Sequence, residues 1–211
     1  MKTALIAGST GLVGKELLHQ LLDSNQFSSV LALTRKTLSV HHSKLRNITV
    51  EFHRLPESPH DLRANHVFCC LGTTMAKAGS KEKFYEVDFR YPLALAETTF
   101  RLGAKHFFIV SALGADKNSG VYYNKVKGES EEAIKSIPFE SIHIFRPSLL
   151  LGKREGSRPG EDIAKTLYKT LGFLVPRKYK AIEASKVARA MLLAALEDQK
   201  GIFIHESAEM Q

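Results

Sequence analysis

A glycine-rich turn near the N-terminus constrains the fold of this chain more than any other feature. Three glycines, Gly8, Gly11 and Gly14, follow the apolar run Ala4–Ala7 and overlap the start of an amphipathic stretch, Leu12–Leu22. A buried strand that leads through such a turn into a helix directs free backbone N–H groups and the positive end of a helix dipole at one point, where a pyrophosphate can bind. The turn therefore predicts a dinucleotide-binding site.

Each glycine of the turn has its own predicted role. Gly8 permits the sharp turn, Gly11 lets the backbone approach the phosphates, and Gly14 lets the helix pack closely on the strand. The spacing is Gly-x-x-Gly-x-x-Gly rather than Gly-x-Gly-x-x-Gly, so a tight structural turn is the alternative interpretation. The predicted cofactor-binding turn consists of Gly8, Ser9, Thr10, Gly11, Leu12, Val13 and Gly14.

The rest of the sequence favours a single α/β domain. A chain of 211 residues with 44% hydrophobic content suits one folding unit with a full core. Short apolar runs alternate with helical patterns, which predicts a Rossmann-like doubly wound parallel sheet. The predicted strands are Thr3–Ala7, Val30–Thr34, Ile48–Phe52, Val67–Leu71, Phe107–Ser111, Ser141–Phe145 and Ile202–His205. The predicted helices are Leu12–Leu22, Tyr91–Leu102, Tyr123–Ser136, Glu161–Leu171 and Ala184–Leu196.

The N-terminus and the cysteines indicate the compartment that we expect. No stretch of about 18 consecutive apolar residues occurs, and the chain runs from Met1-Lys2 directly into a predicted core strand. We therefore expect a soluble, cytoplasmic protein with no membrane partner. Cys69 and Cys70 are adjacent within an apolar strand, and we expect them to be reduced thiols in the core.

The charge and the histidines do not point to nucleic acid or metal. The net charge of +8 is dispersed in small basic groups without an aromatic-interleaved stripe, so we expect no nucleic-acid partner. An anionic cofactor and a solvated surface account for most of this balance. None of the nine histidines pairs with a second His or with Cys at a ligand spacing such as His-x-x-x-His, so we expect no metal site.

The residues that follow the second predicted strand indicate which dinucleotide binds. Ligands of such a sheet bind beyond the carboxyl ends of its strands, and about 20 residues past the glycine turn an Asp or Glu commonly accepts the ribose hydroxyls of NAD. Here that position reads Thr34-Arg35-Lys36. Arginine pairs with a 2′-phosphate through charge-assisted hydrogen bonds, so Arg35 and Lys36 predict NADP(H). A solvated basic turn is the alternative.

Three polar residues form a predicted catalytic group. Tyr123 and Lys127 are four positions apart in a predicted helix, so their side chains share one face. An adjacent ammonium favours the phenolate form of a tyrosine, and Tyr123 then exchanges a proton with a carbonyl or alcohol oxygen. Ser111 ends the fifth predicted strand, and its hydroxyl is expected to polarise the same carbonyl. The alternatives are a surface pair and a turn serine.

The glycine turn, a serine after the fifth strand and Tyr-x-x-x-Lys, in this order, resemble the extended or atypical short-chain dehydrogenase/reductase superfamily. Shorter motifs are similar to the oxidoreductase family of the Tat-interacting protein of 30 kDa. They are Phe68-Cys-Cys-Leu-Gly-Thr-Thr74, Lys77-Ala-Gly79, Lys105-His106-Phe107, Gly114-Ala-Asp-Lys117, Val126-Lys127-Gly128-Glu129, Phe145-Arg146-Pro147 and Ser157-Arg-Pro-Gly-Glu161. That family commonly has two serines where this chain has Ser111-Ala112. If the second serine is the active one in the family, this chain lacks the serine role.

The resemblance implies further contacts to the cofactor. By this resemblance, Ser9 to Val13 contact the pyrophosphate, and Arg35 and Lys36 contact the 2′-phosphate. The residues implied at the adenosine are Leu71, Gly72 and Thr73, and those implied at the nicotinamide end are Lys127 and Leu150. Arg158 and Tyr123 are implied at the cofactor. For Arg158, a solvated loop residue ahead of a helix is the alternative.

Two functions of different classes fit this sequence. The leading hypothesis is an NADP(H)-dependent oxidoreductase that interconverts a carbonyl and an alcohol on a small molecule. The alternative is a non-catalytic NADP(H)-binding redox sensor that acts through a protein partner. An epimerase or dehydratase is disfavoured because no Glu accompanies Tyr123 on its helix face at an obvious catalytic spacing. The substrate itself is not indicated; we expect it to contact a small substrate-side extension formed by residues 147–181.

Overall fold

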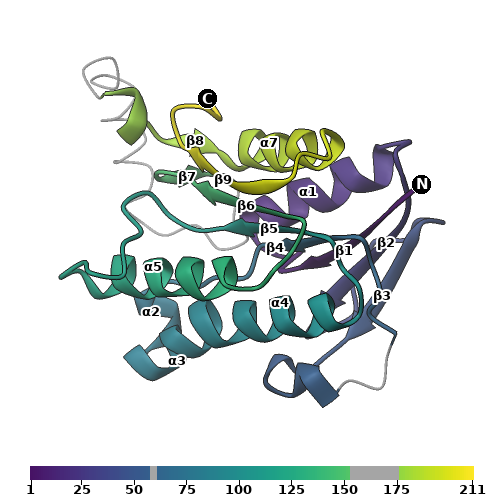
Figure 1. Ribbon diagram of the computed structural model, residues 1–211, viewed down its shortest axis with the longest axis horizontal. Helices are drawn as coiled ribbons and strands as arrows, with labels where there is room; N and C mark the ends of the chain where they lie inside the picture. The colour runs from purple at the N-terminus through teal and green to yellow at the C-terminus, as the bar shows by residue number, and fades with distance from the viewer. Residues whose placement is uncertain (58–60, 153–175) are drawn as a thin grey trace.

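A seven-stranded parallel sheet forms the centre of the molecule (Figure 1). The computed structural model describes residues 1–57, 61–152 and 176–211. The strands are β1 (Lys2–Ala7), β2 (Phe27–Thr34), β3 (Leu45–Thr49), β4 (His66–Cys69), β5 (His106–Val110), β6 (Ser141–Arg146) and β9 (Gly201–Glu206). Their order is β3-β2-β1-β4-β5-β6-β9, and each neighbouring pair is parallel. The predicted Rossmann-like fold is therefore confirmed.

The seven predicted strands all overlap observed strands, and the largest displacement is in β3. This strand begins and ends three residues earlier than the predicted Ile48–Phe52. Its register is set by β2, where Val30 pairs with Leu45 and Thr34 with Thr49. Phe52 is buried, as its hydrophobicity indicates, but it begins a 3-10 helix, η1 (Phe52–Glu57). A buried aromatic residue therefore extended the predicted strand beyond its true end.

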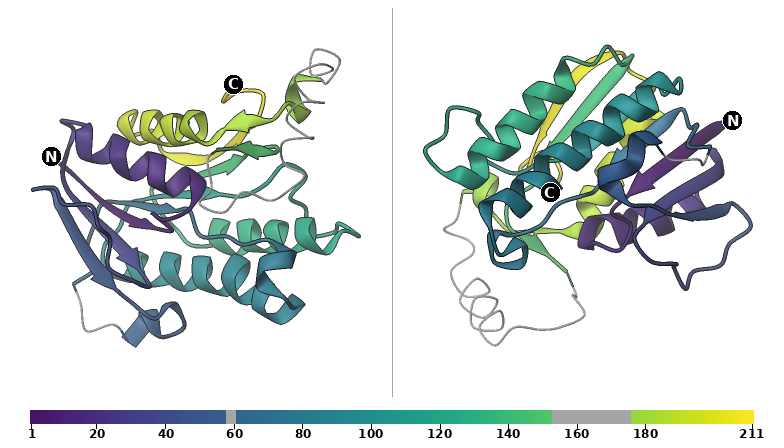
Figure 2. Two further views of the ribbon diagram at one scale, coloured as in Figure 1. Left: turned by 180° about the vertical axis from the view of Figure 1, so that it is seen from behind. Right: turned by 90° about the horizontal axis from the view of Figure 1, so that it is seen from below.

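Helices cover both faces of the sheet. α1 (Leu12–Asp23) and α7 (Ala184–Leu196) lie side by side on one face, and α4 (Tyr91–Arg101) and α5 (Tyr122–Lys135) cover the other (Figures 1 and 2). Successive strand side chains point to opposite faces. Phe108 of β5 thus packs in the core with α1 and α7, whereas Phe107 packs with α4 and α5. These four helices begin and end within one residue of the predicted bounds.

The connection between β4 and α4 contains three helical elements that the sequence pattern did not predict. The N-caps of α2 (Met75–Ala78) and α3 (Lys81–Tyr85) are Thr74 and Ser80. Their hydroxyls accept hydrogen bonds from the backbone N–H groups three residues further on. A π-helix, η2 (Glu86–Arg90), then runs directly into α4. Single turns are too short to show an apolar repeat, so only their caps were visible in the sequence.

A separate two-stranded sheet begins just after the carboxyl end of β6. β7 (Leu150–Leu151) pairs in parallel with β8 (Ile182–Glu183), and a 3-10 turn, η4 (Arg177–Tyr179), precedes β8. The predicted helix Glu161–Leu171 and most of the extension predicted over residues 147–181 lie outside the described residues. In the described ranges, no helix combines the length and the hydrophobicity needed to cross a bilayer.

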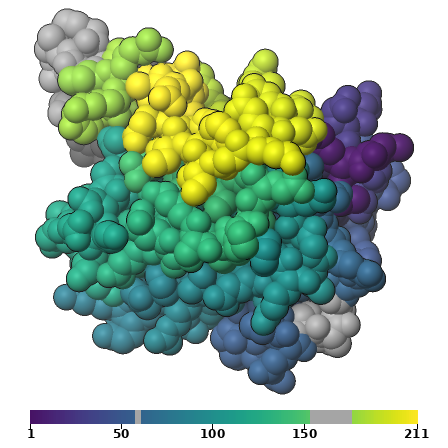
Figure 3. Space-filling model, viewed as in Figure 1, coloured from purple at the N-terminus to yellow at the C-terminus, as the bar shows by residue number. Residues whose placement is uncertain are grey.

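One edge of the sheet, β9, leaves apolar side chains exposed. β9 is an edge strand, and its Ile202 and Ile204 are 52% and 40% exposed. In the space-filling view, the C-terminal residues, coloured yellow, lie openly on the surface beside the green residues of the neighbouring elements (Figure 3).

In β4, near the middle of the sheet, Cys69 is buried, and burial raises the pKa of its thiol to about 12. Cys69 is therefore a protonated core thiol, as predicted.

Candidate active site

The glycine turn connects β1 to α1 in a conformation that only glycine can adopt. Gly8 has a φ of +85°, and a Cβ there would lie 2.4 Å from the carbonyl oxygen of Cys70. A Cβ on Gly14 would lie 2.1 Å from the carbonyl oxygen of Gly8. Both contacts are with backbone atoms that cannot move aside. The predicted turning and packing roles of these two glycines therefore agree with the geometry.

The same turn has the properties of an anion-binding cradle. Gly11 is the N-cap of α1 and provides no side-chain cap, and the first turn of α1 carries no acidic residue. Ser9 is 3% exposed, and its hydroxyl has no hydrogen-bond partner among the described residues. The first N–H groups of a helix also lack intrahelical partners. An orphaned buried hydroxyl beside free N–H groups fits the pyrophosphate of a dinucleotide.

Arg35 and Lys36 follow the carboxyl end of β2, the strand that pairs with β1. Both side chains are exposed. The preceding Thr34 is buried, and its hydroxyl accepts a hydrogen bond of 2.7 Å from the Asn47 amide of β3. The end of β2 is thus fixed, and the two basic residues are free to meet an anionic group.

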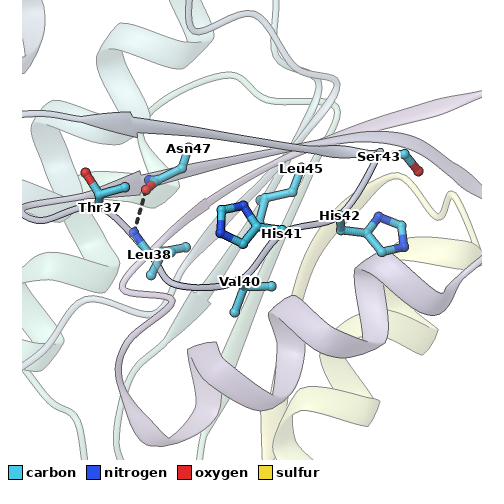
Figure 4. A pocket seen from close by; sticks show the side chains of 8 residues that line it. All are labelled: Thr37, Leu38, Val40, His41, His42, Ser43, Leu45 and Asn47. Carbon is cyan, nitrogen blue, oxygen red and sulfur yellow. Dashed lines mark hydrogen bonds between the residues drawn. The ribbon is translucent and has the colours of Figure 1, made fainter.

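A pocket of about 560 Å³ lies in the connection between β2 and β3, beside α1 (Figure 4). Its wall is braced by a hydrogen bond of 2.8 Å from the Leu38 backbone N–H to the Asn47 side chain (Figure 4). The lining residues are Thr37, Leu38, Val40, His41, His42, Ser43, Leu45 and Asn47. None of the predicted site residues lines this pocket, but its lining begins at Thr37, directly after the predicted contacts Arg35 and Lys36.

Tyr123 and Lys127 lie on one face of α5, one turn apart. Lys127 is 6% exposed, and its Nζ lies 2.8 Å from Asp88 Oδ1. The ring of Tyr123 packs on Phe84, which is fully buried, with ring centroids 5.5 Å apart. The Tyr123 hydroxyl makes no hydrogen bond to the described residues. The predicted pair is therefore brought together, with an ordered ammonium beside an unengaged phenol.

Asp88 connects this pair to the loop after β4. It lies in the π-helix η2 and is 1% exposed. Its Oδ2 accepts a hydrogen bond of 2.8 Å from the backbone N–H of Thr73. A Cβ on Gly72 would lie 3.3 Å from Asp88 Oδ1 and 3.6 Å from Lys127 Nζ. The predicted adenosine loop, Leu71 to Thr73, and the predicted catalytic lysine therefore share one buried carboxylate.

The charge state of Lys127 follows from these neighbours. Burial lowers the pKa of its ammonium, but the negative charge of Asp88, with a smaller contribution from Tyr123, outweighs burial and raises the net pKa. Lys127 is thus a buried cation at neutral pH. π-helical turns often occur at functional sites, and this one delivers the counter-ion that keeps the lysine charged.

Ser111 belongs to a second buried network. Its hydroxyl donates a short hydrogen bond to Glu131 Oε1 of α5, and its backbone N–H donates to Phe145 over 2.7 Å. Arg146 binds the same carboxylate through Nη2, 2.6 Å from Oε2, and Nε, 3.0 Å from Oε1. The single hydroxyl proton of Ser111 is therefore directed at Glu131 rather than at the space in front of Tyr123.

Glu131 is a buried acidic residue of α5 that was not among the predicted site residues. It lies one turn beyond Lys127 and two turns beyond Tyr123 on the same helix face, and it is 1% exposed. The expectation that no Glu accompanies Tyr123 at an obvious catalytic spacing stays a prediction, because Glu131 lies two turns away and pairs with Arg146 and Ser111. The repeat of four positions from Tyr123 through Lys127 to Glu131 was the available signal. Because Arg146 and Ser111 occupy this carboxylate, it acts as a structural anion in this arrangement.

Leu150 and Arg158, both predicted to lie near the cofactor, differ in what the structure describes. Leu150 is partly buried in β7. A Cβ on Gly152, just after β7, would lie 2.8 Å from the Leu12 side chain, so this segment reaches the start of α1. Leu150 is therefore on the ligand side of the sheet, near the glycine turn. Arg158 lies outside the described residues.

This sheet, its glycine cradle and the buried Lys127–Asp88 pair next to Tyr123 define a nicotinamide dinucleotide-binding Rossmann protein of the short-chain dehydrogenase/reductase class. Within that class, the chain belongs to the NAD dependent epimerase/dehydratase family, whose family model matches residues 4–156. The family description supports a nicotinamide dinucleotide cofactor, and it does not test the predicted preference for NADP(H). It also includes the epimerases and dehydratases that the sequence disfavoured.

The chain has close curated relatives. It is 38% identical over 195 residues to Protein HTATIP2 of Rattus norvegicus, which covers 90% of this chain and 80% of that protein. It is 34% identical over 218 residues to "Protein FMP52, mitochondrial" of Eremothecium gossypii, covering 98% and 95%. The resemblance to the family of the Tat-interacting protein of 30 kDa is therefore confirmed.

The fungal names overturn one prediction. Relatives from Eremothecium gossypii and Debaryomyces hansenii are both named as mitochondrial proteins. The prediction of a cytoplasmic protein is therefore wrong as it was made. It depended on hydrophobic segments and the first few residues, which report on membrane crossing and on secretion but not on the choice among intracellular compartments.

Solved structures share the fold at low sequence identity. The Bordetella bronchiseptica enzyme WbmH in complex with NAD+ matches with a TM-score of 0.72 at 14% identity, covering 98% of this chain and 76% of that one. MoeE5 in complex with UDP-glucose and NAD matches with a TM-score of 0.70 at 18% identity, covering 96% and 74%. At these identities the match concerns the fold alone.

Proposed function

We propose that this protein is an NADP(H)-dependent oxidoreductase that interconverts a carbonyl and an alcohol on a small molecule. The observation that carries the proposal is the Lys127 ammonium, buried against Asp88 and one helical turn from the unengaged hydroxyl of Tyr123. A surface Tyr-x-x-x-Lys pair would have no buried counter-ion. Burying a cation is costly, so a lysine held in this way is typical of a functional site.

The residues of this chain divide the chemistry among them. When bound, the dinucleotide supplies or accepts the hydride. Tyr123 donates a proton to the substrate oxygen during reduction and accepts it during oxidation. Lys127 stabilises negative charge on the tyrosine oxygen, and Asp88 keeps Lys127 charged and in place. Lys127 is also the residue proposed to hold the nicotinamide ribose, with Leu150 beside the nicotinamide.

The reaction itself is tested with the purified protein, NADPH and a panel of aldehydes and ketones in an anaerobic stopped-flow instrument. Net oxidation of NADPH that depends on the carbonyl compound is the expected result. An epimerase retains its cofactor without net consumption, and a redox sensor binds NADPH tightly without turnover. Tight binding with no net oxidation across the panel would contradict the proposal and favour one of these two functions.

The proposed preference for NADP(H) rests on Arg35 and Lys36 at the end of β2. Arg35→Ala is expected to weaken NADPH binding by about 10- to 100-fold, because a hydrogen bond between charged groups contributes about 1.5–3 kcal/mol. NADH binding should stay unchanged, since NADH lacks the 2′-phosphate. Thermal shifts with NADPH and NADH measure both affinities. Arg101→Ala, an exposed arginine at the end of α4, is the matched control.

A wild-type protein that is stabilised more by NADH than by NADPH would refute the Arg35 argument. Equal losses of NADPH affinity in Arg35→Ala and Arg101→Ala would do the same, because they would indicate a general effect of charge. Loss of NADPH binding in Arg35→Ala alone supports the assignment. Lys36→Ala should give a smaller loss, because lysine acts as a single point charge rather than a fork.

Ser111 is proposed as the third member of the site, provided that its hydroxyl turns from Glu131 to the substrate oxygen. Ser111→Ala should then reduce kcat by about a hundredfold with little change in KM, as for the loss of one oxyanion donor. Steady-state kinetics measures both constants. An unchanged kcat would show that Ser111 only anchors Glu131, and Tyr123 and Lys127 would then carry the reaction without a serine.

A further inference from the structure

A second cluster of polar side chains lies at the amino ends of the strands. The glycine turn lies at the opposite, carboxyl ends. His66 and His106 begin the neighbouring parallel strands β4 and β5, and Asp198 follows the end of α7. The ligand atoms of these three residues all lie within 4.8 Å of one another. They border a cleft of about 660 Å³ that is also lined by Lys2.

His66 is the residue that points to a ligand. It is 3% exposed, and neither ring nitrogen makes a hydrogen bond within the described part of the chain. Its Nε2 lies 3.5 Å from Asp198 Oδ1. Buried polar groups normally have partners, so these orphaned nitrogens require an explanation.

His106 is arranged as a metal-binding histidine commonly is. Its Nδ1 lies 2.9 Å from the Ser141 hydroxyl, which leaves Nε2 free and fixes the ring. Histidine ligands usually have their second nitrogen held in this way by a neighbouring group. A second histidine pair, the buried His143 and the partly buried His205, is different, because these two rings bond to each other over 3.1 Å.

We propose that His66, His106 and Asp198 bind a divalent transition-metal ion of the zinc class. Two imidazole nitrogens and one carboxylate are a ligand set that such ions prefer. In tetrahedral coordination with metal–ligand distances of about 2.0–2.1 Å, the ligand atoms are about 3.3 Å apart, so the cluster must contract. The rings of His66 and His106 are stacked with centroids 4.5 Å apart and planes 29° apart, so the rings must rotate for one nitrogen of each to face the ion. The Asp198 side chain, 58% exposed after a helix end, adjusts with them. Solvent in the cleft completes the coordination.

Lys2 competes with the metal for Asp198. Its ammonium forms a short ion pair with Asp198 Oδ1 and also donates to the Ala195 carbonyl over 2.8 Å. A divalent ion replaces the first contact, while the Ala195 carbonyl still holds the ammonium. Because that ammonium stays close to the ion, it weakens binding by charge repulsion. Removing the charge of Lys2 should therefore strengthen metal binding, which a purely structural role of the cluster would not produce.

The proposed ion has a structural role and does not depend on the proposed function. It joins the first residues of two central strands, β4 and β5, to the segment after α7. It shares no residue with the site at the glycine turn. His66 and His106 are 40 positions apart, and Asp198 is much farther along the chain. Ligand spacing along the sequence, which led us to expect no metal, could not find a site of this kind.

The test is a titration of the metal-free protein with CoCl₂, followed by displacement with Zn²⁺. We expect one equivalent of Co²⁺ to give visible ligand-field absorption. Asp198→Asn and His106→Ala should each weaken binding by more than about a hundredfold, since even outer-shell changes cost 10- to 100-fold. Lys2→Met should tighten binding by about tenfold. Asp198→Asn changes an exposed side chain and leaves the core intact, so it serves if a histidine variant does not fold.

The matched control is the double variant His41→Ala, His42→Ala, which removes an exposed histidine pair that can bind metal adventitiously. It should bind the single Co²⁺ ion as the wild type does. Loss of the absorption in this control, unchanged binding in Asp198→Asn, or no absorption at one equivalent would each overturn the proposal. So would a Lys2→Met variant that binds Co²⁺ more weakly than the wild type.

Discussion

Tyr123→Phe is expected to lower kcat by about 10²- to 10⁴-fold, the usual range for the loss of a general acid or base. The substitution removes the hydroxyl that is proposed to protonate the substrate oxygen. The ring still packs on Phe84, so the fold and NADPH binding should be retained. Anaerobic stopped-flow oxidation of NADPH measures the rate, and a thermal shift with NADPH confirms that the cofactor site is intact.

Tyr122→Phe is the matched control for this experiment. Tyr122 precedes Tyr123 in the first turn of α5, and its hydroxyl donates to the Lys81 carbonyl over 3.1 Å, so it is directed at α3. The control should turn over at a rate close to that of the wild type. Equal rates for Tyr123→Phe and the wild type would remove Tyr123 from the chemistry, and a similar loss in both variants would indicate a disturbed helix.

Asp88→Asn is expected to destabilise the protein by about 3–5 kcal/mol at pH 7, because it leaves the Lys127 ammonium buried without its counter-ion. The amide preserves the shape of the side chain, so a cavity is not the cause. Urea unfolding at pH 7 measures the loss. Asp23→Asn, at the exposed end of α1, is the control and should change stability by less than about 0.5 kcal/mol.

The pH dependence distinguishes this explanation from a simple loss of packing. In the wild type the pKa of Lys127 is raised above its ordinary value, so its contribution to stability is present below that value and is lost as the pH rises through the raised pKa. In Asp88→Asn the dominant remaining effect is burial, which lowers the pKa. The deficit relative to wild type should then shrink as the pH is raised from 7 towards 10. A deficit that is constant with pH would refute the role of the ion pair.

The fold was predictable because its signals are local. Each strand of the sheet is a short apolar run, and the four helices that cover it show an apolar repeat on one face, as Leu17, Leu18 and Leu21 do in α1. The elements that escaped prediction are single turns such as α2 and α3, which are defined by caps rather than by periodicity. The displaced end of β3 has a similar cause, because burial of Phe52 does not require a strand.

The site was only partly predictable, since two of its members are defined by contacts between distant segments. Tyr123 and Lys127 could be paired from their spacing within one helix. Asp88 could not be paired with Lys127, because the contact depends on how the π-helix η2 docks against α5. Glu131 had a visible spacing on the face of α5, but its partners Ser111 and Arg146 come from two different strand ends.

The packing of α1 against α7 has a consequence for how the chain reaches its native state. Leu17 and Leu18 of the first helix share one apolar core with Val187 and Met191 of the last. During synthesis the apolar face of α1 is thus made long before α7, the helix that covers it. Domains generally fold as units, and exposed apolar surface favours aggregation in the meantime. We therefore expect a chain truncated before α7 to leave the apolar face of α1 exposed and to be prone to aggregation.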